Sequence, residues 1–198
     1  MSSLDDVSRE TLAKLECFRD LLVDENKRQN LVSASTIGDV WDRHIADSAQ
    51  LARLGPPGAS WVDIGSGAGL PGIVLACLVE GPVCLIEPRR LRAEFLRRTI
   101  AELALPNATV VCAKAERAAG KFDVITARAV AKLDQLIAIA AHLSHRGTWW
   151  VLPKGKNAKS ELAEARSNWH CAVREVVSET DPAATILVLT QVKAKRSR

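Results

Sequence analysis

The segment Trp61-Val-Asp-Ile-Gly-Ser-Gly-Ala-Gly-Leu-Pro-Gly72 constrains the fold more than any other part of the chain. It begins with an apolar run, which predicts a buried strand, and continues through a glycine-rich turn into a helix. Gly65, Gly67 and Gly69 allow a sharp turn and leave no side chain between the backbone and a ligand. The segment therefore predicts a strand–turn–helix unit with a ligand at the turn.

Two acidic residues accompany this turn. Asp63 lies two residues before the first glycine, and Glu87 follows an apolar run that predicts a second strand. An acid at the end of the second strand can accept hydrogen bonds from both hydroxyls of an adenosine ribose. The pair of acids therefore indicates a nucleoside cofactor.

Two nucleoside cofactors fit such a turn, NAD and S-adenosylmethionine. The sequence from Gly67 to Gly72 matches the dinucleotide fingerprint, which is a weak signal alone. A dinucleotide fold usually has an apolar residue at position 63 and its third glycine at position 70, where this chain has Asp63 and Leu70. An acid at position 63 can instead hold the charged end of S-adenosylmethionine. This cofactor is favoured, and NAD stays open as the alternative.

Composition sets broad limits. A chain of 198 residues fits one domain with an extension, and its five cysteines are scattered without a Cys-x-x-Cys pair, so we expect no disulfide framework and no metal. No apolar run reaches membrane length, and residues 1–6 lack the basic and apolar parts of a signal peptide. We therefore expect a cytoplasmic protein that does not enter a membrane.

Basic residues form clusters that the net charge of +4 does not reveal. Clusters of this kind can neutralise phosphates, although solvated helix faces have the same composition. Their distribution favours a nucleic-acid partner. The clusters are Arg89, Arg90, Arg92, Arg97 and Arg98; Lys154, Lys156 and Lys159; and Lys193, Lys195, Arg196 and Arg198.

The order of predicted elements indicates an α/β fold. Helices are expected at 8–27 and 37–54, before the break at Gly55-Pro-Pro-Gly58, and then at 70–79, 89–104, 131–144 and 157–168. Strands are expected at 61–65, 83–87, 108–113, 122–127, 147–153, 170–178 and 184–193. Strands joined by helices form a parallel sheet, whereas the short link between the last two strands requires an antiparallel pair.

Several motifs in one order carry a resemblance to a known family. They are Asn30-Leu31, Arg43-His44-Ile-Ala-Asp47-Ser48, Asp63 to Ile73, Phe95-Leu96, Ala115-Glu116, Phe122-Asp-Val-Ile-Thr-Ala-Arg-Ala129, Pro153-Lys-Gly155 and Asp181-Pro182. With these motifs the chain resembles the bacterial 16S rRNA guanine-N7 methyltransferases, the RsmG or GidB family. It departs from the family pattern at Val32, Leu91 and Lys114, outside the cofactor motifs.

The resemblance implies a fold and a site. The fold is a Rossmann-like class I S-adenosylmethionine-dependent methyltransferase, with a mostly parallel seven-stranded sheet at 59–198 and a helical extension at 1–58. The partner is 16S rRNA or the small ribosomal subunit, and the protein is expected to act as a monomer. The expected cofactor residues are Asp63, Gly65, Gly67, Gly69, Leu70, Glu87, Ala115, Glu116 and Arg128. His44, Asp47 and Arg128 are expected to shape the active site, and Arg43, Arg92 and Lys154 to contact RNA.

The end of the fourth predicted strand also bears on the chemistry. Enzymes that methylate exocyclic amines commonly have Asn/Asp-Pro-Pro-aromatic at this point, whereas this chain has Thr126-Ala-Arg-Ala-Val130. Methylation of cytosine C5 needs a nucleophilic cysteine, and methylation of a ribose hydroxyl needs a base. Guanine N7 needs neither, because its lone pair is free. A site without a recognisable base is consistent with N7 transfer.

Overall fold

The computed structural model describes residues 4, 7–33 and 35–195. Arg196 and Arg198 of the expected basic tail, and most of the N-terminal residues 1–6, lie outside the described residues. Within the described part, no helix is both long enough and apolar enough to cross a membrane.

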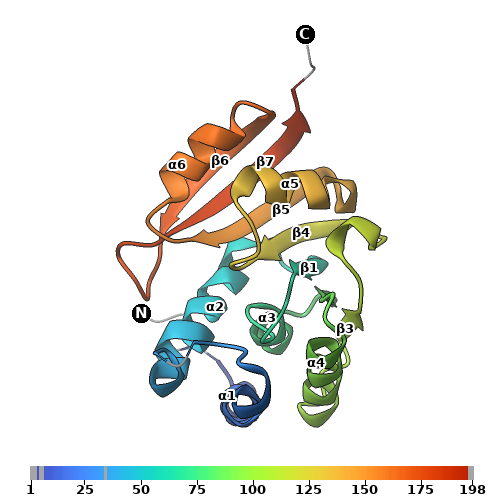
Figure 1. Cartoon of the computed structure of the whole chain (residues 1–198), viewed down its shortest axis with the longest axis vertical. Helices are drawn as coiled ribbons and strands as arrows, with labels where there is room; N and C mark the ends of the chain where they lie inside the picture. Colours follow the sequence, from blue (N-terminus) through green and yellow to red (C-terminus); the bar gives the residue numbers. More distant parts are fainter. Residues whose placement is uncertain (1–3, 5–6, 34, 196–198) are drawn as a thin grey trace.

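One seven-stranded sheet organises the chain (Figure 1). Its order is β3-β2-β1-β4-β5-β7-β6, with β7 antiparallel to both β5 and β6 and the other pairs parallel. The strands are β1 (Trp61–Ile64), β2 (Val83–Ile86), β3 (Ala108–Val111), β4 (Phe122–Ala127), β5 (Ser144–Lys154), β6 (Trp169–Val177) and β7 (Thr185–Ala194). The predicted number of strands and the antiparallel final pair are confirmed.

The chain reverses its direction of travel across the sheet at β1. From β1 the sheet grows to β2 and β3 on one side, and then resumes with β4 on the other side. The carboxyl ends of β1 and β4 therefore border a crevice, because their outgoing connections run in opposite directions. Ligands of open α/β sheets bind at such a switch point.

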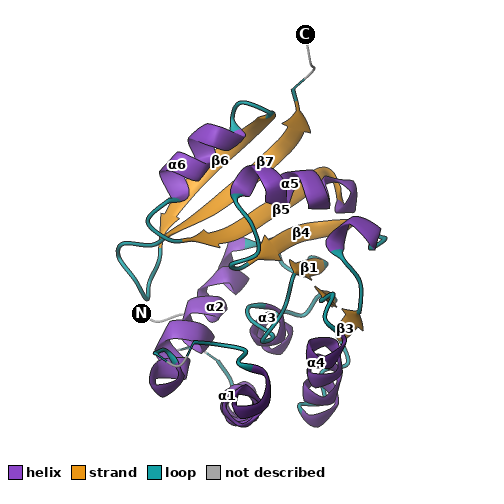
Figure 2. Ribbon diagram, in the orientation of Figure 1, coloured by secondary structure: helices purple, strands orange, loops and turns teal. Residues whose placement is uncertain are grey.

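Helices cover both faces of the sheet, as the contrast of purple and orange in Figure 2 shows. The helices α1 (Arg9–Gln29), α3 (Gly72–Leu78) and α4 (Arg90–Glu102) cover one face, and α5 (Leu133–Ala140) and α6 (Ala158–Ala165) cover the other. Each layer encloses its own hydrophobic cluster. The central strand β1 is consequently buried on both sides, which is why it reads as a continuous apolar run interrupted only by Asp63.

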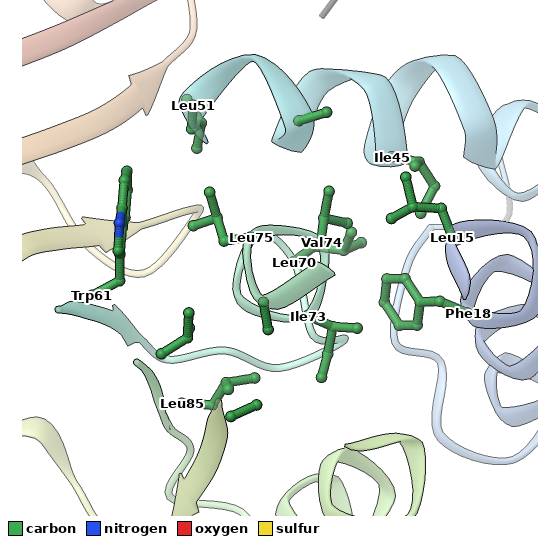
Figure 3. Close-up of a cluster of buried hydrophobic side chains, with 14 of the residues drawn as sticks. Leu15, Phe18, Ile45, Leu51, Trp61, Leu70, Ile73, Val74, Leu75 and Leu85 are labelled. Carbon is green, nitrogen blue, oxygen red and sulfur yellow. The ribbon is translucent and has the colours of Figure 1, made fainter. Parts of the chain in front are cut away.

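The N-terminal helix is built into the larger cluster. Leu15, Phe18 and Leu22 are fully buried, as their helical spacing predicts, and they belong to one cluster with residues of α3 and α4. Figure 3 shows Leu15 and Phe18 beside Ile73 and Val74 of α3. Ser8 caps the helix by accepting a hydrogen bond from the Thr11 N–H, and Asn30 ends it in a left-handed conformation.

The stretch expected as a single helix at 37–54 has a more varied backbone. It comprises a 3₁₀ turn (Ile37–Asp39), a π-helical segment (Trp41–Ala46), one α-helical turn, α2 (Asp47–Ala49), and a second 3₁₀ segment (Gln50–Leu54). Single π turns inside helices are rare and occur often at functional sites. His44 and Asp47 of this stretch both contact Arg128 at the end of β4.

Several other element boundaries also differ from the sequence prediction, including those of α5 and β5. The helix expected at 131–144 is shorter, since α5 spans only Leu133–Ala140 and a 3₁₀ turn (Ala141–Leu143) follows. The strand β5 begins earlier than expected, at Ser144, because the Thr148 hydroxyl accepts from the His145 N–H and donates to the Phe122 carbonyl. Side-chain hydrogen bonds thus extend the strand across a Gly-containing stretch.

Candidate active site at the carboxyl ends of the strands

The glycine turn follows β1 and leads into α3. Gly65, Gly67 and Gly69 have φ angles of +67°, +51° and +89°, values that disfavour any residue with a Cβ atom. The N–H groups of Gly65 and Ser66 donate to the Ile86 carbonyl at 2.8 and 3.0 Å, which ties the turn to the end of β2. The predicted strand–turn–helix unit is therefore present.

Asp63 is completely buried beneath this turn. Its Oδ2 atom accepts the Gly72 N–H at 3.0 Å, whereas its Oδ1 atom has no hydrogen-bond partner among the residues that the structure describes. Burial raises the pKa of Asp63 to about 7, and the Gly72 hydrogen bond and the Arg128 charge oppose this only in part. Thr126, the residue beside Asp63 on β4, also has a buried hydroxyl without a partner. Two unsatisfied oxygens thus lie under the turn, where a donor group could bind.

Glu87 lies at the end of β2 and is 3% exposed. Its Oε2 atom accepts the Gly67 N–H at 2.8 Å, and its Oε1 atom accepts the Arg89 N–H at 2.8 Å. An ionised carboxylate has about four acceptor positions, so each oxygen can still receive a hydroxyl. The carboxylate is therefore held in a fixed position beside the glycine turn and is compatible with a ribose clamp.

Two side chains border the turn from other elements. A Cβ atom on Gly65 would lie 2.7 Å from Val130 Cγ2, so Val130 of the segment after β4 packs directly on Gly65. A Cβ atom on Gly67 would lie 3.6 Å from Arg92 Nη1. The sequence predicted that Arg92 contacts RNA. In the structure its guanidinium lies beside the glycine turn.

Arg128 is the centre of a polar network at the end of β4. Its Nη1 atom lies 3.3 Å from His44 Nδ1 and 3.5 Å from Asp47 Oδ2. The side chains of Arg128 and Asp47 are only 20% and 21% exposed. The structure therefore brings together three residues that the sequence predicted to shape the site, although Arg128 is 84 positions from His44 in the chain.

The protonation of His44 follows from its neighbours. Burial lowers the pKa of His44, and the positive charge of Arg128 lowers it further. Arg128 can only donate, so the Nδ1 atom of neutral His44 accepts and the proton resides on Nε2. That Nε2 atom lies 3.0 Å from Thr36 Oγ1, which can accept from it. His44 is thus an oriented, uncharged acceptor for Arg128.

Asp47 connects the network to the turn between β6 and β7. Its Oδ1 atom accepts from Gln50 Nε2 at 3.0 Å and from the Thr180 hydroxyl at 2.8 Å. Buried Gln50 also donates to the Ser178 hydroxyl and accepts the Glu179 N–H. The N-terminal helical stretch is therefore fixed to the far end of the sheet at the site itself.

A cavity of about 610 Å³ opens next to this network. This volume is within the range of small-molecule sites, and the cavity is bounded by polar groups of the network and by apolar residues. Its floor and walls include Leu31, Thr36, Arg43, His44, Asp47, Arg128, Ala129, Lys154, Thr180 and Asp181. The motifs Asn30-Leu31 and Asp181-Pro182, which are distant in sequence, thus contribute to one site.

The remaining predicted residues have different surroundings. Arg43 lines the cavity and is 63% exposed, with Asp39 at 3.7 Å. Lys154 is only 10% exposed and forms an ion pair with Glu161. Ala115 is buried and Glu116 exposed in the 3₁₀ turn (Ala115–Arg117) after β3.

Comparisons with known proteins agree with this architecture. The family described as GidB, rRNA small subunit methyltransferase G, matches residues 11–184. The chain belongs to this family. A relative named ribosomal RNA small subunit methyltransferase G, from Zymomonas mobilis subsp. mobilis, is 44% identical over 202 residues, which cover 97% of this chain and 91% of the relative. The relative of the same name from Sphingopyxis alaskensis is 46% identical over 194 residues, covering 96% and 83%.

A solved structure supports the fold of this GidB family member. The crystal structure of a SAM-dependent methyltransferase from Aquifex aeolicus matches with a TM-score of 0.63 at 13% identity, covering 83% of this chain and 96% of that protein. At this identity the similarity concerns the fold. The predicted Rossmann-like methyltransferase fold is confirmed.

Sequence reasoning missed several residues of the site in this GidB family member. Gln50, Ser178 and Thr180 connect the network across the sheet, and Val130 packs on the glycine turn. Gln50, which stands between the apolar residues Ala49 and Leu51, was one available signal, because a buried polar side chain needs partners. The identity of those partners depends on the tertiary fold.

Proposed function

We propose that this chain transfers the methyl group of S-adenosylmethionine to N7 of one guanine in the 16S rRNA of the small ribosomal subunit. The observation that carries the proposal is the position of Arg128. It ends the strand next to β1, beside the glycine turn, and it also lines the 610 Å³ cavity. A cofactor at the turn and a base in the cavity would meet at this residue.

The residues of the turn fit the cofactor. The unpartnered Oδ1 atom of buried Asp63 suits the ammonium group of the methionine part, and the fixed carboxylate of Glu87 suits the ribose hydroxyls. Gly65, Gly67, Gly69 and Leu70 would contact the methionine and ribose parts through the backbone. Ala115 and Glu116, at the end of β3, would frame the adenine.

Methyl transfer to guanine N7 requires no acid–base catalysis by side chains of the protein. The bound cofactor supplies a methyl group on a positively charged sulfur. Guanine N7 has a free lone pair, so no proton leaves and no general base is required. The role left for His44, Asp47 and Arg128 is to orient the guanine towards the methyl group. Such orientation supplies a large part of the barrier reduction when two bound partners react.

Arg128 would donate to guanine O6 and leave N7 open. Arginine commonly contacts both O6 and N7, and that arrangement would block the methyl acceptor. His44 and Asp47 restrain the guanidinium from one side, which limits the positions its donors can take. Asp47 also offsets the charge of Arg128, which favours the positive charge that develops on the purine ring.

The RNA surface is proposed around the mouth of the cavity. Arg43 at the mouth and Arg92 on α4 would contact phosphates, which position the RNA without reading its sequence. The target guanine must be unpaired or flipped to enter the cavity. We propose that the protein acts as a monomer and, given its substrate, in the cytoplasm.

The proposal is tested by transfer of labelled methyl from S-adenosylmethionine to small-subunit rRNA that lacks its own N7 mark. Reduction and aniline scission then cleave the RNA at 7-methylguanine. We expect label and a single cut. Label without a cut would support methyl transfer to the RNA but exclude guanine N7 as the acceptor atom. Absence of label on both free rRNA and subunits would exclude the RNA substrate and favour methyl transfer to a protein or small molecule.

A further inference from the structure

Lys154 and Glu161 form an ion pair that is almost removed from solvent. Lys154 Nζ lies 2.9 Å from Glu161 Oε2, and the two side chains are 10% and 19% exposed. Burying two charges is costly unless further hydrogen bonds satisfy them. The additional partners of this pair therefore indicate what it holds in place.

Both charges bond to the backbone that follows β4. Lys154 Nζ donates to the Ala131 carbonyl at 3.1 Å, and Glu161 Oε2 accepts the Leu133 N–H at 2.9 Å. These contacts fix the C-terminal end of residues 129–131, which we name the β4–α5 connection. Arg128, held by His44 and Asp47, fixes its other end. The connection is thus anchored on both sides.

The β4–α5 connection is a strained segment. Ala129 has a φ angle of +56°, in the left-handed region that a residue with a Cβ atom seldom adopts. Such a conformation is unfavourable and persists only where surrounding contacts impose it. The anchors at Arg128 and at the Lys154–Glu161 pair supply these contacts.

This connection separates the two halves of the site. Val130 packs on Gly65 of the glycine turn, and Ala129 lines the cavity. A displacement of the connection would alter the surface offered to the cofactor and the wall of the base cavity together. The Lys154–Glu161 pair can therefore affect the chemistry through this connection, separately from the direct role proposed for Arg128.

We propose that Lys154 and Glu161 are positioning residues that hold the β4–α5 connection against the glycine turn, and that Lys154 is not an RNA phosphate contact. The inference rests on the proposed function, since it takes the glycine turn as the site of S-adenosylmethionine. It departs from the sequence prediction for Lys154, because the ammonium group already donates to Glu161 and Ala131 and the side chain is only 10% exposed.

The test measures S-adenosylmethionine binding by titration calorimetry, without RNA. Lys154→Met and Glu161→Gln each release the same connection, so both should raise the Kd about tenfold, which is about 1.4 kcal/mol. The double variant should be no weaker than the weaker single variant, because the two changes remove one shared restraint. Lys154→Arg, which retains the charge and several donors, should recover most of the affinity.

The neighbouring pair Lys132–Glu164 provides matched controls. It joins the start of α5 to α6 like the buried pair, but its side chains are 65% and 57% exposed. Lys132→Met and Glu164→Gln remove the same charges, and exposed pairs contribute little. Both variants should bind S-adenosylmethionine within about twofold of the unaltered protein.

RNA binding separates positioning from phosphate contact. If Lys154 bound a phosphate, Lys154→Met would lower the salt dependence of RNA affinity by about one unit of slope, and Glu161→Gln would strengthen RNA binding. We expect an unchanged slope for both variants and a rise of KM for S-adenosylmethionine larger than that for RNA. A reduced slope with unaltered cofactor affinity would overturn the inference.

Folding and the proposed function have separate readouts. If Lys154→Met does not fold, Val130→Ala tests the same contact at a side chain that is 39% exposed, and we expect weaker cofactor binding there too. If the unaltered protein fails to bind S-adenosylmethionine, the proposed function fails. If it binds, and Lys154→Met, Glu161→Gln and Val130→Ala bind equally well, the positioning role alone is refuted.

Discussion

The guanidinium of Arg128 lies 3.3 Å from the imidazole of His44, Nη1 to Nδ1, and this contact requires a neutral histidine. Protonation of Nδ1 would replace an acceptor with a donor and place two positive charges side by side. Neutral His44 therefore orients Arg128 together with Asp47, and protonation of His44 would remove one of these two restraints. The N-terminal helical stretch thereby controls a residue at the end of β4.

Arg128→Ala should reduce methyl transfer much more than it reduces stability. The side chain borders both the glycine turn and the cavity, and the loss of one oriented donor in an active site typically costs about 100-fold or more in rate. Single-turnover transfer and the thermal unfolding midpoint measure the two effects. A proportionate loss of both would mean that Arg128 serves the fold alone.

The methyl-transfer rate should decline on the acid side of pH 6.5. The pKa of His44 is lowered from 6.5 by burial and by Arg128. His44 is therefore neutral at pH 7 and becomes charged only below pH 6.5. The stability that depends on neutral His44 is likewise complete above pH 6.5 and is lost as the pH falls through the lowered pKa.

The pH profile of kcat at saturating S-adenosylmethionine checks this, since saturation removes the effect of Asp63 on cofactor binding. His44→Asn should be slower overall and should lack the acid decline. If the decline at acid pH persists in His44→Asn with the same midpoint, a group other than His44 causes it.

Asp63 should make the protein less stable as the pH rises towards neutrality. Burial raises its pKa from 3.8 to about 7, so the folded protein keeps a proton that the unfolded chain releases. The free energy of unfolding therefore falls between pH 3.8 and about 7 and levels off above, by about 4 kcal/mol at most.

Urea unfolding at several pH values between 5 and 8 measures this effect, and Asp63→Asn is the comparison. Asparagine cannot ionise, so the variant should lack the part of the decline that Asp63 causes. Identical pH profiles for the two proteins would show that Asp63 has an ordinary pKa.

Gly65→Ala should destabilise the protein more than Gly58→Ala. Both glycines have φ of +67°, so alanine has the same backbone cost at each, but only at Gly65 would its Cβ atom lie 2.7 Å from Val130, whereas nothing lies within 4 Å at Gly58. Forced contacts in packed regions cost about 1–3 kcal/mol beyond the backbone term.

Chemical unfolding of the two variants gives the difference, and the combination of Gly65→Ala with Val130→Ala should recover most of it. If Gly58→Ala and Gly65→Ala were equally destabilised, Val130 would not pack on the turn in solution.

The sequence by itself determined the architecture. The apolar period and the glycine turn predicted seven strands, the helices between them and an antiparallel final pair, because local periodicity decides which face of an element is buried. It also placed Asp63 and Glu87 at the ends of their strands, since the carboxyl ends of parallel strands share one edge.

Only the tertiary structure decided which side chains meet. Gln50 and Ser178 are 128 positions apart and share a hydrogen bond, and Lys154 turned inward to Ala131 and Glu161 although its sequence position suits a phosphate. A pattern of residue types fixes burial and chemistry at each position. The partner of a buried polar group depends on the path of the whole chain, which brings distant segments within hydrogen-bond distance only after folding.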